Sequence, residues 1–260
     1  MDAVKLALKI DVDSLRATRE GVPRLLDLLN RHEAGATFFF GVGPDHTGGL
    51  ASLVRALPGP DIGRRCAQTM RAVRDAGCEI GMLAWDAAKW RHGVARADAA
   101  WTAEQTGLAM TRFEEIFGER PSVHGAPGWK MNRHAWRNTQ ALAFDYASDT
   151  RGTHPFIPVV RAEIVACPQV PTTLPTLEET DVAALLRETS APRSHVFTLR
   201  VHAVGTKGIA AFERALEGWK AQEYELVRLR DLLGEVAANG LPMHRILEGP
   251  VARQGPRFLT

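Results

Sequence analysis

The sequence predicts a single α/β domain in which a parallel sheet closes toward a barrel. Short apolar runs alternate with amphipathic helical patterns along nearly the whole chain, which is typical of repeated strand–helix units. The 260 residues suit one large domain or two small ones, and the unbroken alternation favours one. A hydrophobic content of 45% and a charged content of 24% are ordinary for a globular, enzyme-like domain.

The first strand is expected at residues 6–13, where an alternating, mostly apolar run ends in two carboxylates. A helix is expected over 18–31 because its apolar residues recur at helical spacing, and a buried strand over 36–42. These three segments form a βαβ unit with parallel strands and a right-handed crossover.

The later segments repeat this pattern. Segment 45–60 is a glycine- and proline-rich loop in which 50–57 has the pattern of a short helix, and segment 84–91 is a loop. We expect one domain over residues 1–240 and an irregular tail over 241–260. The other expected helices cover 62–76, 98–117, 134–141, 182–188, 209–221 and 231–238, and the other strands cover 78–83, 144–148, 164–167, 170–174, 195–202 and 224–227. Segment 123–129 is expected to be a strand followed by a turn.

Composition excludes several classes of protein. The formal charge of +2 makes no electrostatic case for nucleic acid, and no run of about 18 apolar residues occurs that would span a membrane. Met1 leads directly into the first strand, so no secretory signal is expected. The three widely spaced cysteines match neither a disulfide framework nor a zinc knuckle, which favours a reducing cytoplasm.

Asp11 and Asp13 stand out because one residue separates them and both point to the same side of the strand. Parallel α/β folds place their chemistry at the carboxyl ends of the strands, where these two side chains would lie. Two carboxylates there repel each other, so a cation, a shared proton or an arginine is expected nearby. The alternative is a helix N-cap cluster before Ser14.

Further motifs follow in an order that identifies a family. The set comprises Ile10-Asp11-Val12-Asp13, residues 18–26, residues 39–45, Glu79-Ile80-Gly81, Ala84-Trp85-Asp86, Gly128-Trp129, residues 146–152 and residues 171–176. Together they resemble the NodB-type polysaccharide deacetylases, and within these the deformylases of lipid-linked formamido-arabinose in lipid A modification. The resemblance implies an α/β fold, a distorted (β/α) barrel with fewer strands than a full eightfold one.

The resemblance also implies a reaction. In that family one aspartate and two histidines hold a divalent metal, which polarises the amide and its attacking water. A second aspartate acts as base, and a histidine on a late strand acts as acid. Asp13 matches the metal ligand and Asp11 matches the base.

The expected histidines are replaced. Leu83 and Ala87 occupy the two metal-ligand positions, and Arg200 occupies the acid position. Zinc sites take at least three protein ligands, so Asp13 alone is not expected to hold a metal. We therefore expect no cofactor, with zinc or another divalent metal bound only if the site has been rebuilt from other residues.

Two residues on the late strand are candidates to replace the lost groups. Arg200, as an always-charged guanidinium on the inner face, is a hypothetical counter-charge to Asp11 and Asp13. The alternative is that Arg200 points to solvent at the strand end. His202 lies two residues further along and would face the same side of the strand, so it is a candidate proton carrier.

Other positions match substrate contacts of the family. Lys130 replaces an arginine of the deformylases, so a bidentate contact to a carboxylate or phosphate would be lost. Asp149 and Arg151 fit substrate contacts and a structural ion network equally well. The full set of expected substrate contacts is Trp85, Asp86, Gly128, Trp129, Lys130, Asp149 and Arg151.

The sequence therefore favours a deacetylase-fold protein whose hydrolytic site has been dismantled and whose pocket still binds an amino sugar or a polyprenyl-phosphate sugar. One alternative is an active N-deacylase or deformylase with a rebuilt site. Another is a regulatory partner of an active paralogue, with Trp85, Trp90 and Trp101 as candidates for an exposed apolar face. The expected location is the cytoplasm, with the inner face of the cytoplasmic membrane only weakly supported. A homo-oligomer is left open.

Overall fold

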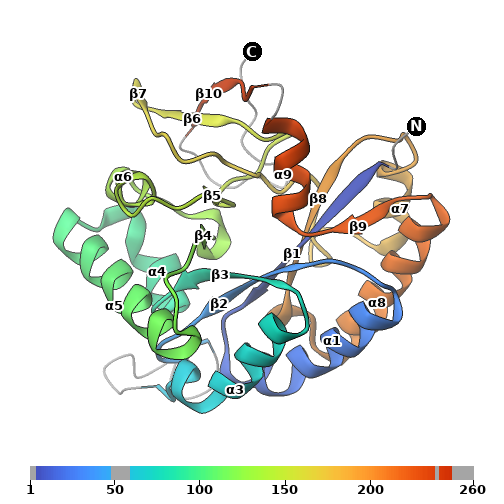
Figure 1. Cartoon of the computed structure of the whole chain (residues 1–260), viewed down its shortest axis with the longest axis horizontal. Coiled ribbons are helices and arrows are strands. Elements are labelled where there is room, and N and C mark those ends of the chain that lie inside the picture. Colours follow the sequence, from blue (N-terminus) through green and yellow to red (C-terminus); the bar gives the residue numbers. More distant parts are fainter. Residues whose placement is uncertain (1–3, 48–58, 238–239, 248–260) are drawn as a thin grey trace.

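The computed structural model describes residues 4–47, 59–237 and 240–247, with the backbone alone for 202–207 and 235–237. Seven parallel strands form one curled sheet in the order β5-β4-β3-β2-β1-β8, and β9 pairs with the first half of β1 (Figure 1). The distorted α/β barrel predicted from the sequence is confirmed. The strands of this sheet are β1 (Lys5–Val12), β2 (Thr37–Gly41), β3 (Glu79–Ala84), β4 (Val123–His124), β5 (Tyr146–Ala147), β8 (His195–Arg200) and β9 (Glu225–Val227).

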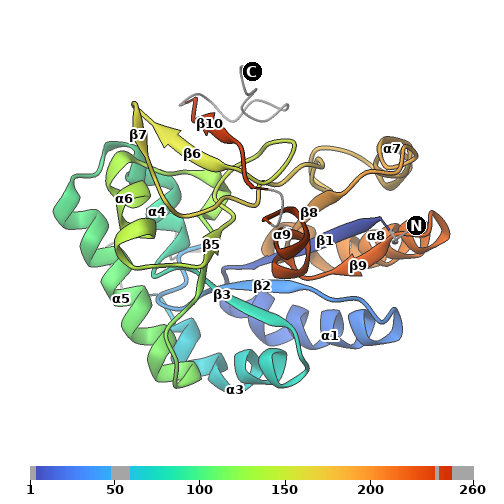
Figure 2. The same ribbon diagram turned by 45° about the horizontal axis from the view of Figure 1, so that its top comes forward.

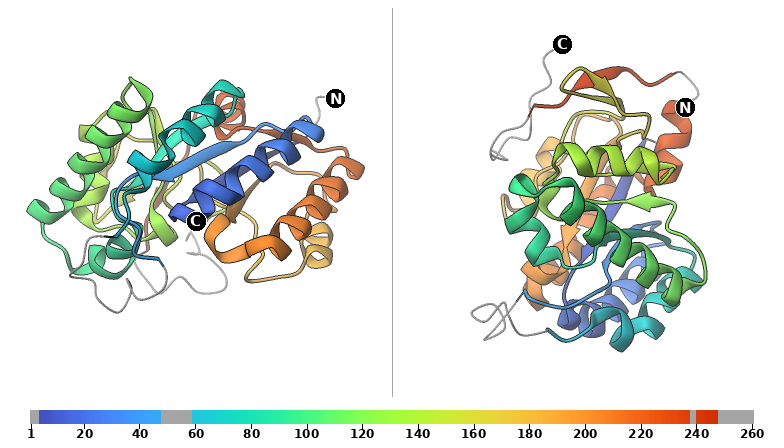
Figure 3. Two further views of the ribbon diagram at one scale, coloured as in Figure 1. Left: turned by 90° about the horizontal axis from the view of Figure 1, so that it is seen from below. Right: turned by 90° about the vertical axis from the view of Figure 1, so that its left-hand side faces the viewer.

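Helices cover the convex side of the sheet, where Figure 3 shows α1, α3 and α8 lying in one layer. Among the described helices, none is long and apolar enough to cross a bilayer. The α-helices are α1 (Val22–Arg31), α3 (Ile62–Asp75), α4 (Ala87–Gly93), α5 (Ala99–Phe117), α6 (Arg133–Ala141), α7 (Val182–Glu188), α8 (Val201–Ala221) and α9 (Leu229–Ala237), with short turns η1 (Ala17–Gly21), η2 (Val94–Arg96) and η3 (Pro127–Trp129).

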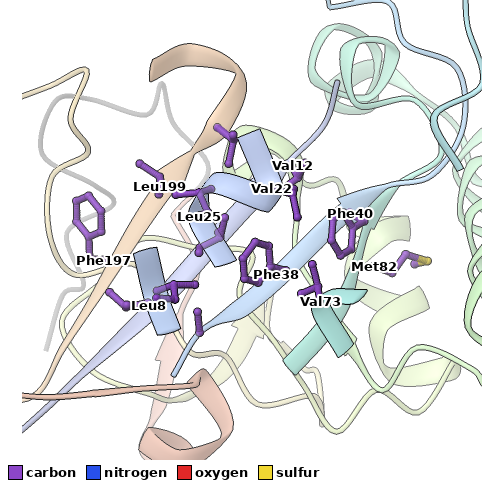
Figure 4. Packing of buried hydrophobic residues seen from close by; sticks show 14 of the residues in the cluster. Leu8, Val12, Val22, Leu25, Phe38, Phe40, Val73, Met82, Phe197 and Leu199 are labelled. Carbon is purple, nitrogen blue, oxygen red and sulfur yellow. The ribbon is translucent and has the colours of Figure 1, made fainter. Parts of the chain in front are cut away.

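Alternation along β1 separates the two faces of the sheet. Its even-numbered apolar residues, from Leu6 to Val12, pack with the helices in the main core (Figure 4). Ala7 belongs instead to the smaller apolar cluster of the concave face. Lys9 and Asp11 share the parity of Ala7 and therefore face the inside of the curl. Because side chains alternate between the two faces of a strand, the charges of Lys9 and Asp11 lie inside the barrel.

A second, three-stranded sheet lies at one end of the molecule, in the order β10-β6-β7 (Figure 2). It consists of β6 (Ile157–Val160), β7 (Glu163–Ile164) and β10 (Met243–Arg245). The prediction that residues 241–260 are irregular is therefore wrong at Met243–Arg245, because β6 offers a partner edge. The strand expected over 170–174 is also wrong, since that segment makes only isolated bridges such as Arg151 to Thr172.

Two boundaries near the carboxyl ends of the strands differ from the prediction. The strand expected over 195–202 ends at Arg200, which is the last residue paired with β1, and α8 begins at Val201. The loop expected over 84–91 contains α4, which begins at Ala87 because the Asp86 carboxylate accepts a hydrogen bond from the Lys89 amide. The short helix expected over 50–57 lies outside the described residues.

Candidate functional site

Asp11 and Asp13 meet at the carboxyl end of β1, as the sequence predicts. Both side chains are buried. In the sheet register, Asp11 lies between Phe39 of β2 and Arg200 of β8. Two buried carboxylates this close need compensating positive charge, so the cations that contact them decide what the site can do.

Lys9 is the cation beside Asp11. It is fully buried, and its Nζ lies 3.4 Å from Asp11 Oδ1 and donates a hydrogen bond to the Ser148 carbonyl oxygen at 2.9 Å. Burial raises the pKa of Asp11 above its usual range, Lys9 lowers it, and the Asp13 carboxylate adds to the rise. Lys9 therefore neutralises Asp11 only in part.

Arg91 is the cation beside Asp13. It projects from α4, and its Nη1 forms an ion pair and hydrogen bond with Asp13 Oδ2. The Asp13 side chain is 2% exposed, whereas that of Arg91 is 22% exposed. The guanidinium therefore covers the carboxylate on one side and is partly open to solvent on the other. A charge-assisted pair of this kind is among the stronger interactions in proteins.

Arg200 does not pair directly with either aspartate. Its Nε lies 3.3 Å from Glu178 Oε1, and its guanidinium lies 5.8 Å from the centroid of the Trp129 ring. Its charge lowers the pKa of Asp11 only as a minor contribution. The hypothesis that Arg200 is the counter-charge to both carboxylates is therefore wrong, because Lys9 and Arg91 fill that role.

His202 lies in the first turn of α8, beyond the end of β8. It does not continue the strand alternation from which its inward orientation was predicted. The structure describes the backbone of His202 without its side chain. Its role as a proton carrier stays a prediction.

A cavity of about 920 Å³ opens beside Arg91 and Trp129. Among the predicted substrate contacts, Trp129, Lys130, Asp149 and Arg151 line it together. Six of its lining residues are arginine or lysine and two are aspartate, so its net field favours anions. The cationic lining residues are Arg91, Arg96, Lys130, Arg133, Arg151 and Arg161, and the acidic ones are Asp98 and Asp149.

Trp129 stands between this cavity and the buried charges. It follows Gly128, and both residues are in the left-handed region, with φ of 56° and 64° respectively. The indole Nε1 donates to Thr172 Oγ1 at 3.1 Å, and the ring lies 5.8 Å from Lys9 Nζ and 4.9 Å from the Arg151 guanidinium. Among the described residues, Arg91 and Trp129 line the cavity, whereas Asp11 and Asp13 do not.

Asp149 and Arg151 have both of the roles that the sequence allows, because each belongs to an ion network and each lines the cavity. Asp149 Oδ1 lies 2.8 Å from His124 Nδ1, and Arg151 Nη1 donates to Glu179 Oε1 at 2.5 Å. Both residues are therefore parts of ion networks that fix their positions. Both also line the cavity, so the networks orient side chains that a ligand can reach.

Trp85 and Asp86 lie elsewhere. Asp86 is buried, caps α4 and pairs with His46 Nδ1 at 2.6 Å, which is a structural role. Trp85 packs against Gly43, and the Arg112 guanidinium lies 5.2 Å from its ring centroid. In the described part of the chain, neither residue borders the cavity.

The other two tryptophans near α4 do not form an exposed face. Trp90 is buried, and its ring packs against that of Trp101 with the centroids 6.0 Å apart. The large apolar side chains exposed in the described ranges are Leu108, Ile164, Met243 and Leu247.

The residues at the expected metal site do not fit a metal. Leu83 packs in the apolar cluster inside the curl, and Ala87 packs in a small cluster around Trp90. Neither side chain has an atom that can coordinate a cation, and the Asp13 carboxylate is bound by Arg91. Of the three ligand positions that the resemblance implies, Asp13 is the one whose side chain carries a donor atom.

One group of candidate metal ligands occurs within the described ranges, at a different place. His32, Glu213 and Glu217 have ligand atoms within 4.8 Å of one another. His32 follows α1, which runs back from the carboxyl end of β1, so this group lies toward the opposite ends of the strands. Glu213 also accepts a hydrogen bond from Arg31 at 2.8 Å.

Sequence reasoning missed Lys9 and Arg91. The signal for Lys9 was present, since a lysine within an otherwise apolar strand shares the face of Asp11. The signal for Arg91 was the spacing of four residues from Ala87, which places both on one helical face. That spacing becomes meaningful only when 87–93 is recognised as a helix.

The comparisons with known proteins identify the family and the fold. A family model described as polysaccharide deacetylase matches residues 4–147. A protein of Shewanella sediminis, assigned as a 4-deoxy-4-formamido-L-arabinose-phosphoundecaprenol deformylase, is 29% identical, and the match covers 89% of this chain and 87% of the relative.

Two solved structures share the fold. A candidate polysaccharide deacetylase from Mycobacterium smegmatis has a TM-score of 0.71 at 18% identity, with 96% of each chain covered. A pseudoenzyme of the CE4 family from Bacillus anthracis has a TM-score of 0.59 at 12% identity, covering 95% of this chain and 70% of that one. A mutant of that pseudoenzyme with restored enzymatic activity has also been crystallised.

Proposed function

Because the chain belongs to the polysaccharide deacetylase family, we propose that it binds an amino sugar or a polyprenyl-phosphate sugar without metal-dependent removal of the N-acyl group. The observation that carries this proposal is the ion pair between Asp13 and Arg91 at the position of the family's metal ligand. The name of the Shewanella relative supports a lipid-linked sugar as the ligand class.

Hydrolysis of an amide needs a polarised carbonyl, an activated water and a proton for the departing nitrogen. Asp13 is engaged by Arg91, and Asp11 is buried beside Lys9 and is not among the residues that line the cavity. Arg200 carries a guanidinium, which is a poor proton donor in proteins. None of the three tasks has a well-placed side chain among those the structure describes.

Ligand binding, by contrast, has a suitable site. A volume of about 920 Å³ suits a small ligand. The Trp129 ring offers an apolar surface for a sugar face, and the excess of cations around it suits a phosphate. Lys130, Arg96 and Arg133 are exposed at this cavity, so a ligand can reach them. A polyprenyl-phosphate ligand places the protein at the inner face of the cytoplasmic membrane.

The test uses 4-deoxy-4-formamido-L-arabinose phosphate carrying a short prenyl chain as the probe. Calorimetry measures binding, and a coupled assay measures formate release. We expect binding that Lys130→Ala weakens and Lys89→Ala does not, because Lys130 lines the cavity and Lys89 does not line it. Formate release above the buffer rate supports an active deformylase instead. Absence of binding favours the regulatory-partner alternative.

A further inference from the structure

We infer that Arg91 acts as the chain's own replacement for a metal ion and excludes divalent cations from Asp13. The inference deepens the proposed function, on which it rests for the absence of a metal-dependent step. It adds a specific cause, which is a residue outside the motifs that the sequence resemblance singled out. Leucine and alanine at positions 83 and 87 take away possible ligands, whereas the Arg91 guanidinium occupies Asp13 Oδ2 itself.

The helical register explains how Arg91 reaches Asp13. Ala87 is the first residue of α4 and occupies one of the two lost ligand positions, and Arg91 is one turn further along the same helix. Helical side chains lean toward the N-terminus, so the Arg91 side chain lies over the turn that contains Ala87. The methyl group of Ala87 leaves that space open. The guanidinium consequently contacts the carboxylate that a metal would otherwise contact.

Neighbouring groups hold Arg91 in this position. The Arg91 carbonyl oxygen accepts a hydrogen bond from Lys130 Nζ at 2.9 Å, and the adjacent Trp90 Nε1 donates to the Lys130 carbonyl oxygen at 2.8 Å. The Arg91 side chain also lies against Gly128, because a Cβ atom at that residue would be in van der Waals contact with Arg91 Cδ at 3.4 Å. The ion pair is therefore built into the contact between α4 and the segment after η3.

Charge makes the exclusion effective. A divalent ion at Asp13 has to displace a guanidinium that makes a charge-assisted hydrogen bond, and then lie close to its positive charge. An arginine does not lose its proton at any physiological pH, so it cannot be neutralised to make room. A variant with histidines at positions 83 and 87 should therefore bind a divalent metal only weakly while Arg91 remains.

The experiment compares zinc affinities by calorimetry. All variants carry His32→Asn, which takes a ligand away from the group of His32, Glu213 and Glu217 and so weakens zinc binding there. The starting protein is Leu83→His/Ala87→His. Adding Arg91→Ala should tighten zinc binding by roughly 100-fold at one ion per chain, because the competing cation is gone. Adding Arg96→Ala removes the same charge from the same cavity and should leave the affinity of the starting protein unchanged.

Three outcomes overturn the inference. In the first, the starting protein binds zinc as tightly as its Arg91→Ala derivative. In the second, Arg96→Ala tightens binding as much as Arg91→Ala. In the third, no variant binds zinc. Sugar binding and formate release are measured on the unmodified chain, so a failure here is distinguishable from a failure of the proposed function.

Leucine 83 is buried, so the histidine substitution risks unfolding, and a second measurement avoids it. Arg91→Ala alone removes the arginine partner of the Asp13 carboxylate and leaves the Lys9–Asp11 pair in place. Millimolar Mn²⁺ should then raise the melting temperature of Arg91→Ala but not that of Arg91→Ala/Asp13→Asn or of Arg96→Ala. Equal responses in all three variants would contradict the exclusion.

Discussion

Removal of Arg91 should destabilise the protein more than removal of an exposed arginine at the cavity, because it takes a counter-charge away from the buried Asp13 carboxylate. Exposed ion pairs contribute at most about 1 kcal/mol, whereas breaking a buried pair costs about 3–5 kcal/mol. With Asp13 2% exposed and Arg91 22% exposed, the pair lies between these limits. We expect Arg91→Ala to lower the free energy of unfolding by about 2–3 kcal/mol.

A double-mutant cycle measures this pair directly. Arg91→Ala, Asp13→Asn and the double variant are unfolded in urea and followed by circular dichroism. The coupling energy should be about 2–3 kcal/mol, and the melting temperature of Arg91→Ala should fall by roughly 4–12 °C. Asp13→Asn keeps the size of the side chain, so packing changes little.

Arg96→Ala is the matched control, because Arg96 is an exposed residue at the same cavity. Its effect should stay within about 0.5 kcal/mol. A coupling energy below about 0.5 kcal/mol, or equal losses in the two alanine variants, would refute the reasoning.

Four further variants test the account of the fold. Burial lowers the pKa of His195 to about 4, so below the usual histidine pKa the unfolded chain binds a proton that the folded chain refuses. The contribution of His195 to the free energy of unfolding should therefore be complete above about pH 6.5 and fall by about 3 kcal/mol toward pH 4. In urea unfolding experiments, His195→Asn should lack this part of the pH dependence. Lys9→Met should destabilise the fold by about 3–5 kcal/mol at pH 7, because it strands Asp11. That loss should shrink on acidification as Asp11 becomes protonated, and an unchanged loss would argue against the pairing. Gly43→Ala should cost about 1–3 kcal/mol, since its Cβ would lie 2.5 Å from a tryptophan ring atom, whereas Gly107→Ala, which meets nothing within 4 Å, should gain about 1 kcal/mol. Thermal melts that place both alanine variants on the same side of the parent would contradict this packing.

The order of the elements could be predicted because it follows from local patterns. The alternation at residues 6–13 identified β1, and helical spacing identified α1. Errors arose where tertiary contacts decide the outcome. The alternation of 195–202 continues past Arg200, but β1 provides pairing only as far as Asp11, so the chain turns into α8.

The acidic residues of the charged site could be predicted from the sequence, whereas their cationic partners could not. The two aspartates and the missing histidines are visible in the sequence, and a compensating cation was expected. Identifying that cation required the start of α4, which depends on the Asp86 cap and its contact with His46. Arg200 was the obvious candidate by motif position, yet Glu178 engages it from another segment.

The most direct test of the central claim is the metal content of the purified chain after incubation with zinc, cobalt and nickel and removal of unbound ions. Elemental analysis is run in parallel on His32→Asn, so that metal at the surface group of His32, Glu213 and Glu217 is recognised. With Arg91 on Asp13, both proteins should contain only trace metal once that surface contribution is subtracted. One ion per chain in His32→Asn, lost in Asp13→Asn, would contradict the account and make hydrolysis the leading function.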